Sequence, residues 1–464
     1  YANKYYFTSN IRRDGASNFA KNNKWATFYS FVAAYNLAGE SFMKDFLWLD
    51  LFKIRYSYGY TGNQGIGAYA SLAQYISTNY PFGGYIENGY ILSGTNPGNA
   101  NLKWETTKQQ NLGADISVFK SRLNITVDAY YKHTYDLLQY LSVAMSNGVM
   151  QIPMNVGEVE NKGLEFSVSG VPVSTKNFTW NISANWSANR NKVLKYKAAG
   201  GQTVYGPYKL DGLLLKEGHP MGQLYGYLED GYWNSNQDYK NSDYYAWIAK
   251  HKPAELPSDG AITQAYLGEI KYKDINGDSI LNESDRTMIG NVNPGFIYGF
   301  TNNFTYKNLS LNIFFQGVYG NDILNAMLLS FNSTSTWENR PPNLLDNAWT
   351  PERAQNNPGI IKYPKMGENL TRTTRFSRRY VEDGSYLKLK SVSLSYKINK
   401  PFKLKYLQTV TLTVTGTNLL TFTKYTGFDP EVNSIGSGNA SWRGIDVGAY
   451  PSARTYTFSV NVLF

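Results

Sequence analysis

Apolar and polar residues alternate along most of the chain with a period of two. In the segment 123–129 the odd positions are apolar and the even positions are polar. The same alternation recurs in four further segments, at 178–187, 309–316, 409–415 and 456–464. Because a β-strand points successive side chains to opposite faces, this pattern predicts strands rather than helices.

The number and length of these segments favour one all-β architecture over another. Roughly thirteen segments alternate in this way, and most are about ten residues long or longer. Strands of soluble β-sandwiches average about 5–6 residues. A strand of about ten residues tilted by about 40° spans about 25 Å, the height of the apolar band of an outer-membrane barrel. We therefore expect an antiparallel transmembrane β-barrel, with a soluble β-sandwich as the alternative.

The connections between these segments are of two kinds. Short ones occur at 119–122, 175–177 and 306–308, and long ones lie near 62–101, 230–268 and 319–383. Outer-membrane barrels have tight turns at the periplasmic end and larger loops at the extracellular end. The sequence thus predicts one barrel domain over residues 1–464 with three long extracellular loops, and loops of this length usually carry function.

Tryptophans stand out within and beside the long connections. An exposed indole ring stacks on a sugar ring or grips a peptide, so these residues are candidates for substrate binding. Each of them equally well packs a small core inside its own loop. The candidate residues are Trp233, Trp247, Trp337, Trp349 and Trp442.

Composition removes several classes of protein. The chain has 464 residues and no Cys, which excludes a disulfide scaffold, a Cys-ligated zinc site and a thiol nucleophile. An aromatic content of 16% argues against disorder. No apolar run reaches the roughly 18 residues of a transmembrane helix. The net charge of +10 is spread along the chain, which favours a solvated basic surface or loops that face lipopolysaccharide over nucleic-acid binding.

The sequence contains little that indicates catalysis. The three histidines, His133, His219 and His251, are isolated and lack metal-ligand spacing. No nucleophile elbow, P-loop or dinucleotide fingerprint stands in a suitable setting. Carboxylates at predicted lumen positions, such as Asp115 and Asp128, fit a water-filled interior better than a glycosidase pair. We therefore expect a protein that is not an enzyme.

One segment has the spacing of a calcium-binding loop. Hard oxygen ligands occur at relative positions 1, 3, 5, 9 and 12, and position 7 would supply a backbone carbonyl. Two positions depart from the pattern, because Ser279 occupies the sixth position, where glycine is usual, and the last ligand is Asp rather than Glu. The alternative is an Asx-rich turn without metal. The candidate ligands are Asp274, Asn276, Asp278, Ile280, Asn282 and Asp285.

Several motifs resemble the C-terminal part of the SusC/RagA family of TonB-dependent transporters. They follow one another in the order of the family over nearly the whole chain, which makes them specific as a set. Asn18 and Ala20 depart from the residues that are usual in the first motif. The motifs are NIRRDGASNF at 10–19, LFKIRYSYGYTGNQ at 51–64, NLKWETT at 101–107, NVGEVENKGLE at 155–165, TNLLT at 417–421 and GFDPE at 427–431.

The resemblance implies a location, an activity and partners. It implies roughly the last 13 to 14 strands of a barrel of about 22 strands, in the outer membrane of a Gram-negative bacterium. The plug domain is absent from this chain, and we expect the remaining barrel and plug segment to come from other polypeptide. The implied activity is import of oligosaccharides or peptides, driven by TonB through that N-terminal part and assisted by a SusD-like surface lipoprotein. A soluble, secreted glycan-binding β-protein is the alternative from another class.

Overall fold

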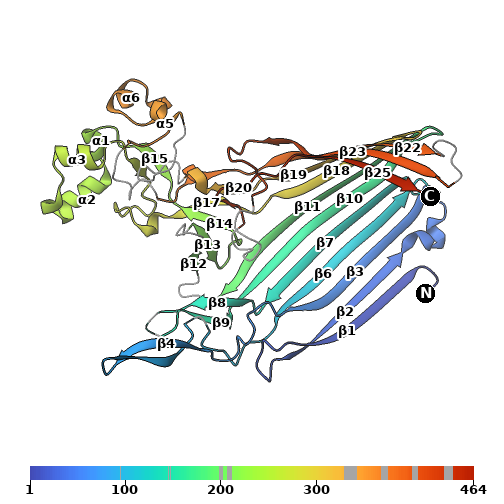
Figure 1. The fold of residues 1–464 in the computed structure, drawn as a ribbon, viewed down its shortest axis with the longest axis horizontal. Coiled ribbons are helices and arrows are strands. Elements are labelled where there is room, and N and C mark those ends of the chain that lie inside the picture. The colour runs from blue at the N-terminus through green and yellow to red at the C-terminus, as the bar shows by residue number, and fades with distance from the viewer. Residues whose placement is uncertain are drawn as a thin grey trace.

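A curved antiparallel sheet of 12 strands dominates the structure (Figure 1). The computed structural model describes residues 1–94, 96–144, 146, 148–197, 202–205, 212–328, 342–366, 375–399, 406–432 and 443–464. Within the sheet, each strand pairs with the next sheet strand along the chain. The strands in order are β1 (Tyr5–Gly15), β2 (Trp25–Asn36), β3 (Leu49–Asn63), β6 (Glu105–Val118), β7 (Leu123–Tyr135), β10 (Gly157–Ser174), β11 (Phe178–Tyr196), β18 (Phe296–Tyr306), β19 (Leu309–Tyr319), β22 (Tyr386–Asn399), β23 (Thr409–Thr423) and β25 (Thr455–Leu463).

The predicted all-β antiparallel architecture is confirmed. The sheet strands are 9 to 19 residues long, which exceeds the strand length of soluble sandwiches. The sheet contains 12 strands in the described residues, against the 13 to 14 expected. Some alternating segments of the long connections, such as β4 (Tyr75–Phe82) and β5 (Tyr85–Leu92), pair with each other instead of joining the sheet.

The two faces of the sheet differ in character. The register places Val127, Phe166 and Trp186 side by side on one face of β7, β10 and β11. The neighbouring row, on the opposite face, is Thr126, Ser167 and Asn185. Because the side-chain period is two, a slip of one residue would exchange these faces, so the alternation in the sequence fixes the register. The apolar face is exposed in the described chain, up to 78% at Phe458 on β25.

Long and short connections lie at opposite ends of the sheet. Since neighbouring strands are antiparallel, the short turns 119–122, 175–177 and 307–308 share one end, where both termini also lie (Figure 1). The other end carries 64–104, 136–156, 197–295, 320–385 and 424–454. The connections expected near 62–101 and 319–383 match two of these, and the region 230–268 is the middle of a longer one. The connections 136–156 and 424–454 were not predicted from the sequence.

The buried cores involve the long connections and the strand ends beside them. One core consists of residues from three different connections, 197–295, 320–385 and 424–454. They include Leu213, Leu224, Leu324, Tyr380 and Ile445. A second core packs Phe19, Phe28, Leu102 and Trp104 at the ends of β2 and β6. The long connections are therefore folded against one another rather than independent. No helix in the described part of the chain is both long and apolar enough to cross a membrane.

The long connections contain short elements of their own, which Figure 1 shows to the left of the sheet. Besides β4 and β5 they are β8 (Leu138–Ser142), β9 (Gln151–Asn155), β12 (Gln202–Tyr205), β13 (Leu213–Lys216), β14 (Gln223–Gly226), β15 (Glu229–Tyr232), α1 (Asn236–Lys240), α2 (Asp243–His251), α3 (Asp259–Ala265), β16 (Ile270–Tyr272), β17 (Thr287–Asn291), β20 (Asp322–Asn325), α5 (Leu344–Asn347), α6 (Pro351–Asn356), β21 (Val381–Asp383) and β24 (Ile445–Asp446).

Candidate functional site

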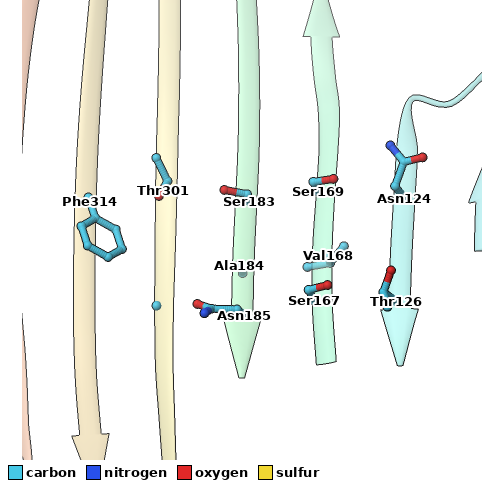
Figure 2. Close-up of a pocket in the computed structure, with 11 residues that line it drawn as sticks. Asn124, Thr126, Ser167, Val168, Ser169, Ser183, Ala184, Asn185, Thr301 and Phe314 are labelled. Atoms are coloured by element: carbon cyan, nitrogen blue, oxygen red, sulfur yellow. The ribbon is translucent and has the colours of Figure 1, made fainter. Parts of the chain in front are cut away.

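A shallow groove of about 340 Å³ runs across the polar face of the sheet (Figure 2). It crosses five strands, from β7 to β19, and every polar side chain that lines it is an uncharged hydroxyl or amide. Gly299 helps to keep it open, because a Cβ atom there would lie 2.7 Å from Oδ1 of Asn185. Hydroxyl and amide groups both donate and accept hydrogen bonds, so this surface suits a hydrated solute. The polar lining residues are Asn124, Thr126, Ser167, Ser169, Ser183, Asn185 and Thr301.

Charged residues on the same face lie beside this groove and are paired. Arg55 donates from Nε to Oδ2 of Asp115 at 2.8 Å and from Nη2 to Oδ2 of Asp128 at 3.2 Å. Asn111 donates to the other oxygen of Asp128 at 2.8 Å. Both carboxylates therefore already have partners, which fits lumen charges better than a pair of catalytic acids.

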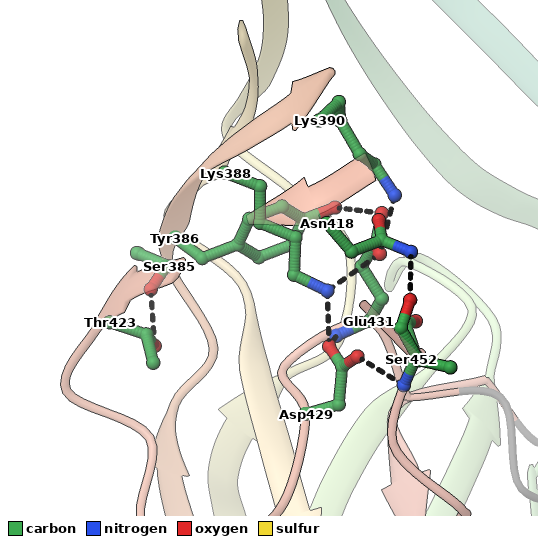
Figure 3. Close-up of polar contacts among 10 residues, drawn as sticks. Ser385, Tyr386, Lys388, Lys390, Asn418, Thr423, Asp429, Glu431 and Ser452 are labelled. Atoms are coloured by element: carbon green, nitrogen blue, oxygen red, sulfur yellow. Dashed lines mark hydrogen bonds and ion pairs between the residues drawn. The ribbon is translucent and has the colours of Figure 1, made fainter. Parts of the chain in front are cut away.

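A buried lysine joins the sheet to the connection 424–454 (Figure 3). Lys388 of β22 is 1% exposed and donates from Nζ to Asp429 at 2.5 Å and to Glu431 at 2.7 Å. Lys390 donates to Glu431 as well, at 2.7 Å. Asp429 also accepts from the backbone N–H of Ser452 at 3.1 Å. These contacts fasten two parts of the connection to the wall of the sheet.

The surroundings of Asp429 stabilise its charged form. Burial by itself would raise the pKa of this carboxyl, but hydrogen bonds from Lys388 and from the backbone of Glu431 and Ser452 outweigh it and lower the pKa to about 2. The sequence motif GFDPE contains both carboxylates but gives no sign of the lysine, which lies 41 residues before Asp429. This cluster could not be found from local spacing.

The five tryptophans predicted to bind substrate differ in their positions. Trp233 is half-buried and lines a cavity, with Nζ of Lys271 4.8 Å from the centre of its ring. Trp247 stacks on His251 at 4.9 Å within α2 and does not line that cavity. Trp349 is 4% exposed and donates from Nε1 to Oδ1 of Asn234 at 3.0 Å, so it packs the interior of the connections. The remaining two, Trp337 and Trp442, lie outside the described residues.

The cavity at Trp233 has a volume of about 630 Å³ and is walled by β15, β16 and the segments around α1 and α2. Serine side chains cap the helices that shape it: Ser235 accepts from the N–H of Asp238, and Ser242 accepts from the N–H of Tyr245. Such caps satisfy N–H groups at the helix start and set where each helix begins. Its aromatic lining residues are Trp233, Tyr239, Tyr244, Tyr266 and Tyr272.

The predicted calcium loop forms part of the wall of this cavity. Both carboxylate oxygens of Asp274 accept backbone N–H groups, from Gly277 and Ser279. Asp285 is fully buried and likewise accepts from Ile275 and Asn282. The loop as it stands is an Asx-rich turn whose carboxylates are already hydrogen-bonded.

Two further observations concern metal binding at this loop. Among the described residues, no group of three or more His, Cys, Asp or Glu side chains is arranged to hold a metal ion. Ser279 nevertheless adopts φ of +61°, the conformation that glycine provides at this position of a calcium loop. Calcium binding stays a prediction.

Comparisons with known proteins agree with this architecture. A family model described as TonB dependent receptor-like, beta-barrel matches residues 1–266. TonB-dependent receptor P3 of Formosa agariphila is 38% identical over the whole chain, and TonB-dependent receptor SusC of Bacteroides thetaiotaomicron is 28% identical. The structure of the RagAB peptide transporter matches 99% of the chain with a TM-score of 0.80 at 25% identity.

The chain spans less than half the length of these proteins. It covers 44% of receptor P3, 42% of SusC and 46% of the matched chain of the RagAB transporter. The matches therefore concern one part of a larger architecture.

Proposed function

Because the chain belongs to the TonB-dependent receptor-like β-barrel family, of the SusC/RagA type, we propose that it is part of an active importer of oligosaccharides or peptides. Membership of this family implies an outer-membrane location and a transport protein rather than an enzyme. The observation that carries the proposal is the contrast between the two faces of the sheet. One face exposes Phe166 and Phe458, and the other bears the uncharged groove.

This contrast fits a barrel wall that separates lipid from an aqueous interior. Apolar side chains exposed in a row cost free energy in water at about 25 cal/mol per Å², and they are stable against hydrocarbon. The same contrast argues against the soluble glycan-binding alternative, whose outer face would be polar. The polar groove would then line the path of the solute.

The partners in this proposal follow from the long connections and from the relatives. A SusD-like surface lipoprotein would cover the end of the sheet that carries the connections from 64–104 to 424–454. The RagAB structure is that of a peptide transporter, which supports a role in import. The importer would be completed by the remaining barrel strands, the plug segment and TonB. Lipid and lipopolysaccharide would surround the barrel wall.

Deletion of the gene tests the proposal. The mutant is grown on a panel of oligosaccharides and of peptides, each as the sole carbon source and each beside its monomer. We expect loss of growth on one polymer but not on its monomer, restored by the full-length gene. Unchanged growth across the panel, or recovery of the protein in the culture fluid rather than in outer membranes, would contradict it.

A further inference from the structure

Two polar groups that line the Trp233 cavity lack partners in the described part of the chain. The hydroxyl of Tyr272 is buried and has no hydrogen-bond partner there. Arg375 makes no hydrogen bond or ion pair there, and its guanidinium instead lies over the rings of Tyr227 and Tyr272, at 5.1 and 5.9 Å. A buried hydroxyl without a partner is costly, so both groups are available to a ligand.

Both groups require a hydrogen-bond acceptor on the ligand. The hydroxyl of Tyr272 can donate a hydrogen bond to an acceptor of the ligand. Arginine has five N–H donors and no acceptor, and its fork matches a carboxylate best. Lys273 lines the same cavity and forms no ion pair within the described residues. Arg375 and Lys273 are thus two cations of this wall that have no ion pair within the described residues.

The carboxylates that line the cavity make contacts of their own. Asp230 lies 3.8 Å from Lys271, and Asp274 accepts two backbone N–H groups. Asp243 stands in the first turn of α2, where the helix start favours a negative charge. Glu269 is buried and has contacts of its own.

The shape and the aromatic lining indicate a ring rather than an extended chain. A volume of about 630 Å³ suits a compact ligand of one or two rings. Trp233 supplies an indole face, and Asn241 and Ser242 supply amide and hydroxyl groups at the same cavity. Peptides held by their backbone use a strand edge or a long groove, whereas this site is a concave pocket of side chains.

We propose that this cavity binds a carboxylate-bearing sugar unit, a uronate within an oligosaccharide. Arg375 and Tyr272 hold the carboxylate, and Trp233 stacks on the sugar ring. The inference deepens the proposed import function, from which it takes its biological meaning, and it names a saccharide rather than a peptide. Its binding step is independent of transport and can be measured separately.

Binding to the full-length protein in detergent tests the site. The probes are trisaccharides of galacturonate, mannuronate and glucuronate, their neutral galactose, mannose and glucose counterparts, and triglutamate, all measured by calorimetry. We expect at least one uronate to bind tenfold or more tighter than its neutral counterpart. Arg375→Gln should weaken that binding about tenfold or more, and Tyr272→Phe should weaken it about threefold to tenfold.

Control variants distinguish a loss of binding from a loss of folding. Arg454→Gln removes an exposed arginine outside the cavity, and Tyr406→Phe removes an exposed hydroxyl beside the turn end of the sheet, so neither should alter binding. Tyr272→Phe should melt no lower than the parent protein, because the lost hydroxyl has no partner in the described chain.

Three outcomes would overturn the inference. They are no preference for any uronate over its neutral counterpart, equal binding by the Arg375 and Tyr272 variants, and Arg375-dependent binding of triglutamate in place of the sugars. Growth that survives gene deletion, together with Arg375-dependent uronate binding, would instead refute the import function and leave the site standing.

Discussion

Asp429 illustrates how a single carboxyl can hold a connection against the sheet. It is 9% exposed and accepts hydrogen bonds from the Lys388 ammonium and from two backbone N–H groups, of Glu431 and Ser452. Removing one partner of such a buried pair leaves the other charge uncompensated, which typically costs about 3–5 kcal/mol. The connection 424–454 is therefore expected to depend on the ionised state of this residue.

The pKa of Asp429 makes this dependence measurable. A carboxyl whose pKa is lowered to about 2 stabilises the folded state fully above its unfolded pKa of about 3.9, and this contribution disappears as pH falls toward 2. We expect Asp429→Asn to lower the melting temperature at pH 6 and the difference from the parent protein to shrink between pH 4 and pH 2. A difference that stays constant over that window would contradict the assignment.

The tryptophans show why the roles of single residues are the hardest feature to predict from sequence. Trp233 and Trp349 are each followed in the chain by a polar residue, yet one lines a cavity and the other donates to Asn234, 115 residues away. Nothing in the local sequence marks Lys388 or Tyr272, because the role of each depends on surroundings that the fold brings together. Only the tertiary structure distinguishes a binding aromatic from a packing one.

Strands, at the next scale, were the most predictable part of the molecule. The period of two in the segment 123–129 predicts that Thr126 and Val127 lie on opposite faces, since backbone geometry alone dictates that alternation. The connections were less predictable, and the borders of 197–295 were missed because its short elements contain alternating and helical residues in turn.

Two neighbouring residues of β10 test the placement of the sheet in a membrane. Phe166→Arg puts a charge on the apolar face, where it costs about 2–4 kcal/mol near the middle of a bilayer, whereas Ser167→Arg puts the same charge on the polar face. We expect Phe166→Arg to lower the yield of heat-modifiable barrel in outer membranes and Ser167→Arg to leave it near the parent level. Equal effects would argue against lipid at this face.

The effect of calcium on the melting temperature tests the predicted calcium loop. If Asp274, Asp278 and Asp285 ligate Ca²⁺, calcium should raise the melting temperature of the parent protein, and Asp278→Ala should abolish that rise. Glu283→Ala is the matched control, because Glu283 lies in the same loop but not at a ligand position. Equal shifts in the parent protein and in Asp278→Ala would identify the segment as a metal-free Asx turn.

At the scale of the whole molecule, the sheet has two open edges within the described chain. Within the described chain, β1 pairs only with β2 and β25 pairs only with β23 (Figure 1). An open strand edge leaves a row of N–H and C=O groups without partners, which hydrocarbon does not tolerate. A sheet with one apolar face therefore requires closure, and we expect further strands to provide it.

Hydrogen exchange of the native protein in outer membranes tests this closure. If other strands pair with both edges, the amides of β1 should exchange as slowly as those of β2, which is paired on both sides. In an open sheet, alternate amides of β1 would instead point away from β2 and exchange quickly. Fast exchange confined to β1 and β25, with β2 and β23 protected, would show that the 12 strands stand without a closing partner.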